Sequence, residues 1–544
     1  MRVINGALSK IAMAILKERY LLRNKEGKAT ETVREMFFRV ARAVAVNESA
    51  EWEQKFFQLM SSLRFLPNSP TLMNAGKKQG QLSACFVLPV EDSVEKIFET
   101  VKLAAKIHQT GGGTGFSFSK LRPKGSPVSR VPGVASGPVS FAKIFDATTE
   151  AVKQGGARRG ANMAVLRVDH PDILEFINAK RDFKSFQNFN LSVGITRAFV
   201  SALVHRQKFA LVDPRTNRIT ARGDAREIFN LIAQAAWECG DPGLIFLDRI
   251  NLFNPTPRLG QIESTNPCGE EPLLPFESCN LGSLNLAAYV SREQVDWGTL
   301  AQDVTTATRF LDNVIDVNNY PSRECEKWAR ENRKIGLGVM GFADALLRLR
   351  INYNSPKAVE FAEKVMSFID NHAKAASVEL AKKRGAFLNW KNSLWDQLGY
   401  PKMRNATVTT VAPTGTISLI AGVSSGIEPI YGEIVRRQML DGKVFEIVHP
   451  DVKKSKYRKV WCPAEQVEIK AHINVQAAFQ RYSDSGVSKT INLPKDSTVK
   501  DVKEAFLLAY KKGCKGITIY RSGSRPKQVL QTKRVCLDCS VCLG

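Results

Sequence analysis

The chain has 544 residues, of which 44% are apolar, and a formal net charge of +25. This length allows a large enclosed core and exceeds the usual size of a single domain. No apolar run reaches the roughly 18 residues of a membrane span, and ten cysteines are too few for a disulfide scaffold, so we expect a cytoplasmic protein with no membrane partner. The excess of Lys and Arg indicates either an anionic partner or basic solvated faces, and charge alone does not distinguish them.

Residues 1–65 predict a small helical domain. The stretch MRVINGALSKIAMAILKERYLL begins like a signal peptide, but Lys10 and Lys17 fall at helical spacing and no small-residue cleavage site follows. We therefore interpret it as an amphipathic helix. Between residues 30 and 45 apolar side chains recur at every third or fourth position, and Thr32 and Glu35 fit a capping box, which predicts a further amphipathic helix.

Residues 66–525 have a different sequence pattern. Short apolar runs alternate with helical stretches and Gly/Pro turns, and this alternation predicts an α/β domain with mostly parallel strands. Residues 526–544 are basic and polar and then rich in cysteine, which predicts a flexible C-terminal tail. The strand-like runs are ACFVLPV, TGFSFS, MAVLRV, LSVGIT and GITIY.

Three glycine-containing stretches raise the question of nucleotide binding. KIGLGVMGFADALLRL has the dinucleotide-binding spacing, but it follows polar residues and lacks a clear βαβ unit, so glycine packing between a helix and a strand is the favoured role. APTGTIS (412–418) predicts either a turn that opens into a helix and holds a phosphate or an ordinary capped turn. QGGARRGANM (154–163) places Arg158 and Arg159 between glycines, as a phosphate-gripping loop or a surface turn would.

The stretch TNPCGEEPLLPFESCNLGS (265–283) carries two of the cysteines, Cys268 and Cys279. Asn266, Cys268 and Glu270 alternate, so in an extended conformation their side chains would point to the same side. A thiol beside a carboxylate suits hydrogen-atom or electron chemistry that also needs a general base. Two buried cysteines with a purely structural role are the alternative, and the spacing alone leaves both interpretations open.

This stretch resembles the active-site signature of ribonucleotide reductases, specifically the adenosylcobalamin-dependent class II enzymes. The resemblance implies an α/β fold, a ten-stranded α/β barrel with a central finger loop, preceded by the small helical domain. It also implies reduction of ribonucleotides to 2′-deoxyribonucleotides for DNA synthesis by thiyl-radical chemistry, with adenosylcobalamin (cobalt) as the cofactor. Similarity to the dimeric branch favours diphosphate substrates and a homodimer. The likeness extends, in the same order, to LPNSPTLMNAG, SACFVLPVEDS, GGGTGFSFSKLRPKGS, QGGARRGANMAVLRVDHPDILEFINAKRD, NRKIGLGVMGFADAL, APTGTISLIAGVSSGIEPIY and KGCKGITIYRSGSRP.

The resemblance implies a role for each residue of the catalytic centre. Cys268 would become the thiyl radical that takes the 3′-hydrogen from the substrate ribose. Glu270 would remove the 3′-hydroxyl proton, and Asn266 would hydrogen-bond to the reacting sugar. Cys85 and Cys279 would supply two reducing equivalents and end as a disulfide.

Further residues are implied for substrate, effector and reductant. A turn would bind the substrate phosphates, and a deoxynucleotide or ATP effector would select the base at a separate site. Tail cysteines would re-reduce the active-site disulfide by thiol exchange and would then be reduced by a thioredoxin-like protein. The substrate set is Ser69, Ala84, Pro413, Thr414, Gly415, Thr416 and Ile417; the effector set is Asp92, Arg158, Lys180 and Arg181, with the loop up to Asn188; and the redox-tail set is Cys536, Cys539 and Cys542.

The class rests on two further motifs. A class I large subunit, which receives its radical from a separate subunit through two adjacent tyrosines, is the alternative; the matching stretch GITIYRSGS holds only Tyr520. DNHAKA (370–375) comes close to the Asp-x-His-x-x-Gly of one kind of cobalamin site but ends in Ala and predicts an ordinary helix, so we name no metal ligand.

The remaining expectations concern regulation and competing functions. The helical domain begins almost at once, so we expect specificity control without an ATP/dATP on-off switch. A regulatory protein with an inactive barrel is disfavoured because all five catalytic residues are present. Specific nucleic-acid binding is disfavoured because no recognisable module with interleaved aromatic residues occurs.

Overall fold

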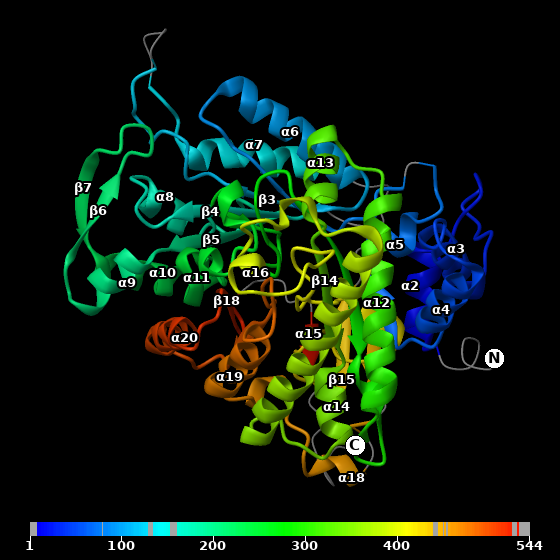
Figure 1. The fold of residues 1–544 in the computed structure, drawn as a ribbon. Helices are drawn as coiled ribbons and strands as arrows, with labels where there is room; N and C mark the ends of the chain where they lie inside the picture. The colour runs from blue at the N-terminus through cyan, green and yellow to red at the C-terminus, as the bar shows by residue number, and fades with distance from the viewer. Residues whose placement is uncertain are drawn as a thin grey trace.

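The described part of the N-terminal domain contains three helices, shown in blue in Figure 1. The structure is a computed structural model, and it describes residues 8–78, 80–128, 134–152, 160–438, 444–449, 451–452, 455–524 and 530–532. The helices are α2 (Lys10–Arg19), α3 (Val33–Val44) and α4 (Ala50–Ser61).

Local sequence signals explain where these helices begin. The Ser9 side chain caps α2 by accepting a hydrogen bond from the Ala12 N–H, 3.1 Å away. Thr32 and Glu35 form a complete capping box at α3, in which each side chain accepts the other's backbone N–H. The predicted helices over both stretches are therefore confirmed within the described residues.

The barrel is built from two runs of parallel strands. The first run contains β2, β3, β4, β5 and β8 in neighbouring positions. Nearly every residue in these strands is buried, as is typical of parallel strands covered on both faces. The strands are β2 (Cys85–Leu88), β3 (Gly113–Ser117), β4 (Asn162–Arg167), β5 (Phe189–Ile195) and β8 (Gly243–Phe246).

The second run meets the first antiparallel at both edges. Strand β18 pairs antiparallel with β8, and β11 pairs antiparallel with β2. Within this run β17 is parallel to β18, and β14 is parallel to β11. Residues 407–411 lie between these two pairs. They form parallel bridges to β14 on one side and to the chain just before β17 on the other. The ten-stranded sheet thereby closes into a ring. The strands are β11 (Ser278–Asn285), β14 (Ile335–Met340), β17 (Thr490–Leu493) and β18 (Gly516–Arg521), with β1 (Phe65–Pro67) antiparallel on β11.

The five strand-like runs predicted from sequence correspond to β2, β3, β4, β5 and β18, so the prediction of a mostly parallel α/β fold is confirmed. Helices cover the outside of the ring, and the hairpin of β6 and β7 projects from one side (Figure 1). The main outer elements are α5 (Ser69–Asn74), α6 (Val94–Gln109), α7 (Pro138–Ala151), α8 (Ile173–Asn178), α9 (Arg197–Val204), β6 (Lys208–Val212), β7 (Ile219–Asp224), α10 (Ala225–Cys239), α12 (Trp297–Val317), α13 (Arg323–Asn332), α14 (Phe342–Arg348), α15 (Pro356–Arg384), α19 (Ile469–Gln480) and α20 (Val499–Lys511).

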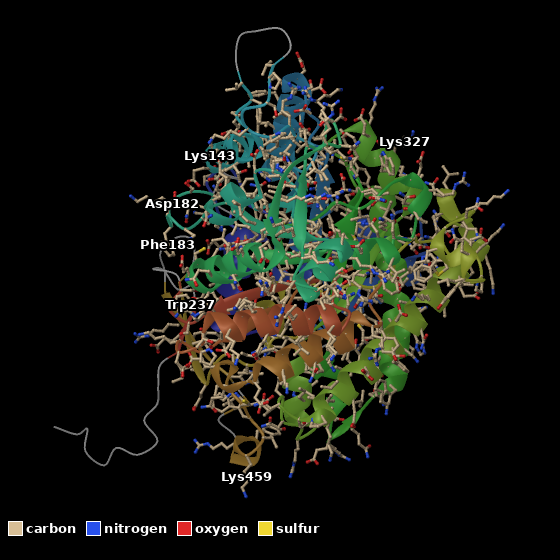
Figure 2. All side chains as sticks on the ribbon, turned by 90° about the vertical axis from the view of Figure 1, so that its left-hand side faces the viewer. Lys143, Asp182, Phe183, Trp237, Lys327 and Lys459 are labelled. Atoms are coloured by element: carbon tan, nitrogen blue, oxygen red, sulfur yellow. The ribbon has the colours of Figure 1, made fainter. Side chains whose placement is uncertain are left out.

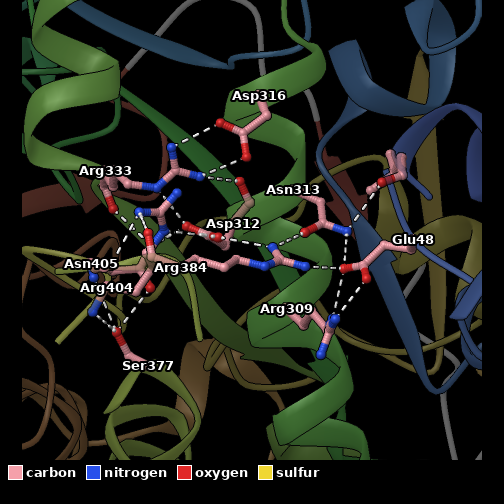
Figure 3. Close-up of polar contacts among 12 residues, drawn as sticks. Glu48, Arg309, Asp312, Asn313, Asp316, Arg333, Ser377, Arg384, Arg404 and Asn405 are labelled. Carbon is pink, nitrogen blue, oxygen red and sulfur yellow. Dashed lines mark hydrogen bonds and ion pairs between the residues drawn. The ribbon is translucent and has the colours of Figure 1, made fainter. Parts of the chain in front are cut away.

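The helical domain is joined to the barrel by a buried polar network (Figure 3). Glu48, between α3 and α4, accepts two hydrogen bonds from Arg309 of α12, at 2.7 and 2.6 Å, and one from Asn313 at 2.9 Å. Arg384 at the end of α15 also pairs with Glu48. These partners lower the pKa of Glu48 to about 2 against the opposing effect of burial. The carboxylate is therefore charged when the two domains are docked.

The Gly-x-Gly spacing at residues 336–338 serves backbone packing inside the barrel. Both glycines lie within β14, where a Cβ on Gly338 would come within 2.2 Å of the Thr410 carbonyl oxygen. We expected these glycines to let a helix pack on a strand. That expectation is wrong, because the segment that packs against them is the extended chain 407–411 and not a helix. DNHAKA lies within α15, as predicted. Among the described residues, no helix is both long and apolar enough to cross a membrane.

Candidate active site

A short hairpin inside the barrel carries the candidate catalytic residues. Strands β9 (Ser264–Thr265) and β10 (Pro272–Leu273) pair antiparallel, and the chain turns between them. Gly269 donates its N–H to the Asn266 carbonyl at 3.1 Å, which closes a β-turn with Pro267 and Cys268 at its centre. The extended conformation expected for this segment is wrong, since the hairpin reverses at these residues. The hairpin still directs Asn266, Cys268 and Glu270 to one cavity.

Glycines in β3 make room for this hairpin. A Cβ on Gly115 would lie 1.7 Å from the Thr265 carbonyl oxygen, and one on Gly113 would lie 2.8 Å from Pro267. Backbone and ring therefore contact the barrel wall directly, at a distance only glycine allows. The GGGTG motif thus positions the catalytic turn instead of cradling a phosphate.

Cys85 and Cys279 lie opposite each other in the barrel wall. They are paired residues of β2 and β11, and both thiols are free and buried. Cys268 is likewise not joined in a disulfide within the described part of the chain, and it is exposed at the tip of the hairpin. The Asn266 side chain donates a hydrogen bond to the Cys85 sulfur at 3.0 Å and thus connects the hairpin to the cysteine pair.

The electrostatics of the site keep the cysteine pair protonated. Burial, together with the nearby carboxyl groups of Glu270 and Glu271, raises the pKa of Cys85 well above its ordinary value. Burial and Glu271 do the same for Cys279. Burial, followed by the charge of Glu270, raises the pKa of Glu271 to about 8. The pair is therefore set up as a neutral dithiol at neutral pH.

The predicted substrate residues line the same cavity, whose volume is about 300 Å³. Thr414 has a positive φ of 50°, a conformation that costs energy for a non-glycine residue. Its side chain accepts a hydrogen bond from Gly426 at 2.7 Å, and its carbonyl accepts one from Ser418 at 2.9 Å. The turn opens into the short helix α17 (Ile417–Ala421), which both sequence interpretations of this stretch allow. The lining includes Ser69, Ala84, Pro413, Thr414, Gly415, Thr416 and Ile417.

The described effector candidates already have partners within the fold. Asp92 pairs with Arg122 at 2.8 Å, and Arg181 pairs with Glu238 at 2.6 Å. Lys180 pairs with Asp241 at 2.9 Å. Arg158 lies outside the described residues, as do Cys536, Cys539 and Cys542.

The loop that follows Arg181 reaches the surface. Figure 2 shows Asp182 and Phe183 at one edge of the molecule, near Lys143 of α7. Hydrogen bonds from Ser185 and Lys184 lower the pKa of Asp182 to about 2. The loop is therefore held in shape by a charged carboxylate.

Sequence reasoning missed two residues that line the cavity and one that lies buried behind it. Glu271 follows Glu270 directly, and that adjacency was the available signal for a second carboxyl group. Its N–H donates to the Asn266 side chain at 3.0 Å, so it also shapes the turn. Arg19 and Tyr20 reach the cavity from α2 and its end, and nothing in their sequence context indicates this.

Two models of one protein family match this chain. The family model described as "Ribonucleotide reductase, barrel domain" matches residues 83–520, and the one described as "Ribonucleotide reductase, all-alpha domain" matches residues 7–80. The chain belongs to the ribonucleotide reductase family, and it is an oxidoreductase.

Its relatives fall into two groups by name. A Thermoplasma acidophilum protein is 47% identical, covering 95% of this chain and 79% of the relative, and is named a vitamin B12-dependent ribonucleoside-diphosphate reductase. A Mycobacterium tuberculosis protein with the same name is 47% identical, covering 96% of this chain and 81% of the relative. A Chlamydia muridarum ribonucleoside-diphosphate reductase subunit alpha is 28% identical, covering 94% of this chain and 58% of the relative.

Proposed function

We propose that the chain is a class II enzyme that reduces ribonucleoside diphosphates to 2′-deoxyribonucleoside diphosphates with adenosylcobalamin. The names of the relatives at 47% identity support both the cofactor and the phosphate level. The observation that carries the proposal is the arrangement of three thiols, with Cys268 exposed on the hairpin and Cys85 opposite Cys279 beside it. One thiol is accessible to a radical source, whereas the other two form a buried electron reservoir.

The residues divide the reaction between them. Cys268, as a thiyl radical, takes the 3′-hydrogen from the ribose and returns it to C3′ at the end of the reaction. Glu270 accepts the 3′-hydroxyl proton while the 2′-hydroxyl leaves as water, and gives it back when the 3′-hydroxyl re-forms. Asn266 holds the sugar and the Cys85 sulfur through its amide. Cys85 and Cys279 lose two electrons and two protons as they form a disulfide, which balances the loss of one oxygen atom as water.

Small residues share the cavity wall with Cys268. Gly113, Ala161 and Pro267 line the same cavity, and both Ala161 and Cys268 are exposed. We assign the cofactor to the exposed side of the Cys268 thiol. Bound adenosylcobalamin supplies the radical chemistry that a protein side chain cannot start by itself.

The remaining ligands follow from the same proposal. The turn of residues 413–417 would bind the substrate phosphates, and Ser69 and Ala84 would contact the substrate. Asp92, Arg158, Lys180 and Arg181 would belong to an effector site for a deoxynucleotide or ATP. The tail cysteines, a thioredoxin-like reductant and a homodimer complete the proposal.

A class I large subunit is the alternative. It would need a separate radical-generating subunit, and the relatives named subunit alpha share only 28% identity with this chain. The identity of 47% with B12-dependent relatives favours class II.

The test is anaerobic incubation of the protein with adenosylcobalamin, a dithiol reductant, CDP or CTP and candidate effectors. Deoxycytidine nucleotide that forms only with the cofactor, and that disappears in Cys268→Ser but not in Cys462→Ser, would support the proposal. Product that requires an added metal-containing subunit instead would establish the class I alternative.

A further inference from the structure

The N-terminal helical domain contributes a cation to the cavity of the barrel. Arg19, the last residue of α2, lines the cavity together with the turn of residues 413–417. Among the described residues that line this cavity, Arg19 and Glu270 are the charged side chains. The binding of an anionic ligand in this cavity would therefore depend on the positive charge of the Arg19 side chain.

The guanidinium group of Arg19 is not satisfied by the described part of the chain. Its Nε atom is buried and has no hydrogen-bond acceptor among the described residues. A buried donor without a partner is costly, so such groups usually meet a ligand or water. The Asn68 amide nitrogen and the Ser283 hydroxyl, also on the cavity wall, are buried without partners as well. The unpaired donors thus gather where a polar ligand would bind.

The position of Arg19 is fixed by its neighbours. The Tyr20 hydroxyl hydrogen-bonds to the Ser69 hydroxyl at 2.8 Å, and the Tyr20 side chain is buried. Helix α2 also packs against α17, the helix that follows the turn at residues 413–417. The backbone at Arg19 is therefore held near that turn before any ligand binds, which reduces the entropy lost on binding.

We propose that Arg19 binds the 5′-phosphates of the nucleotide substrate, so that the N-terminal domain supplies a specificity-determining residue to the barrel's active site. Guanidinium groups bind phosphate oxygens through paired, charge-assisted hydrogen bonds. The proposal rests on the proposed function, since it assigns the phosphate end of the same substrate. It also gives the helical domain a direct part in substrate recognition.

The experiment measures equilibrium binding of CDP and of cytidine to the full-length protein and to three variants. Arg19→Ala should weaken CDP binding by about tenfold to a hundredfold, as expected for the loss of a charged hydrogen-bond partner, and leave cytidine binding unchanged. Arg19→Lys should recover part of the CDP affinity because it keeps the charge. Lys17→Ala, at an exposed position of the same helix, is the matched control and should bind both ligands like the wild type.

The outcomes separate this inference from the proposed function. CDP affinity that is unchanged in Arg19→Ala, or that falls equally for CDP and cytidine, would overturn the inference. Deoxynucleotide formation by the wild type tests the proposed function independently of Arg19. If the protein binds CDP in an Arg19-dependent way but does not reduce it, the inference about Arg19 stands and the proposed function is wrong. A wild type that does not bind CDP would overturn both.

Discussion

Cys85 and Cys279 are direct cross-strand neighbours where β2 and β11 meet antiparallel. Residues in this relationship have Cβ atoms about 4.5–5.5 Å apart, close to the separation of about 3.5–4.5 Å found in disulfides. A small inward movement of the two strands therefore suffices to join the sulfurs. The pair can change between dithiol and disulfide without a rearrangement of the barrel.

This relationship predicts the fate of the two thiols during turnover. Without an external reductant, the wild type should form about two deoxynucleotides per active site, one from the Cys85–Cys279 pair and one from the proposed tail dithiol, and should accumulate a Cys85–Cys279 disulfide, because each pair holds only two electrons. Cys279→Ser should stop turnover at that stage or before it. Peptide mapping by mass spectrometry checks the linkage, and Cys462→Ser, which leaves the pair intact, should behave like the wild type. Multiple turnovers by Cys279→Ser would contradict the assignment.

Glu270 is predicted to act in catalysis more than in binding. Glu270→Gln keeps the size of the side chain but removes the base, so kcat should fall by about 10²–10⁴-fold while KM changes little. Steady-state assays with CDP measure both constants. Glu263→Gln is the control, since Glu263 precedes the hairpin and pairs with Lys120 near the surface. A rise in KM with unchanged kcat would instead assign Glu270 to substrate binding.

Glu271 predicts a pH-dependent stability. Its pKa rises from 4.5 to about 8 on folding, so folding favours the protonated carboxyl group. That contribution is fully present below about pH 4.5 and is lost as the pH rises through 8. Glu271→Gln cannot ionise at this position. The Tm of the variant minus the Tm of the wild type should therefore be larger at pH 8 than at pH 5, by roughly 2 °C or more. Thermal unfolding at the two pH values is the measurement, and an equal difference at both would show that Glu271 does not titrate in this range.

Gly115 is predicted to be irreplaceable for a steric reason. The Cβ of Gly115→Ala would overlap the Thr265 carbonyl oxygen, so the hairpin that carries Cys268 must move. Activity should fall by at least about 100-fold, because catalysis depends on sub-ångström positioning. Gly298→Ala, at an exposed position of α12 where a Cβ would make only an ordinary contact with the Asp296 side chain at 3.6 Å, should retain activity. Normal activity in Gly115→Ala would mean that the hairpin lies farther from β3.

Glu48 predicts acid sensitivity of the domain contact. Its pKa falls from 4.5 to about 2 on folding, so its stabilising contribution is present above pH 4.5 and is lost as the pH falls toward 2. Glu48→Gln should destabilise the protein at pH 7 by on the order of 3 kcal/mol, since it leaves two partly buried arginines without their charged partner. The difference from wild type should narrow by pH 3 in denaturant titrations. Glu51→Gln, in an exposed pair with Lys55, should have little effect at either pH.

Local patterns in the sequence determined a large part of this fold. The capping box at Thr32 and Glu35 and the apolar spacing between residues 30 and 45 depend on neighbouring residues alone, and α3 forms as they predict. The short apolar runs likewise become β2, β3, β4, β5 and β18, because parallel strands buried on both faces need continuous apolar sequence. The motifs around Cys268 also sufficed to identify the family.

Tertiary structure alone decided which distant residues meet. Asn266, Cys268 and Glu270 converge because a turn reverses the chain, whereas their alternation suggested an extended segment. The glycines of β3 and β14 are explained only by the backbone that passes over them. Arg19 reaches the active-site cavity because α2 packs against α17, and no local pattern encodes a contact between segments so far apart in the chain. Such contacts arise from the closure of the barrel and the docking of the helical domain, which depend on the whole chain at once.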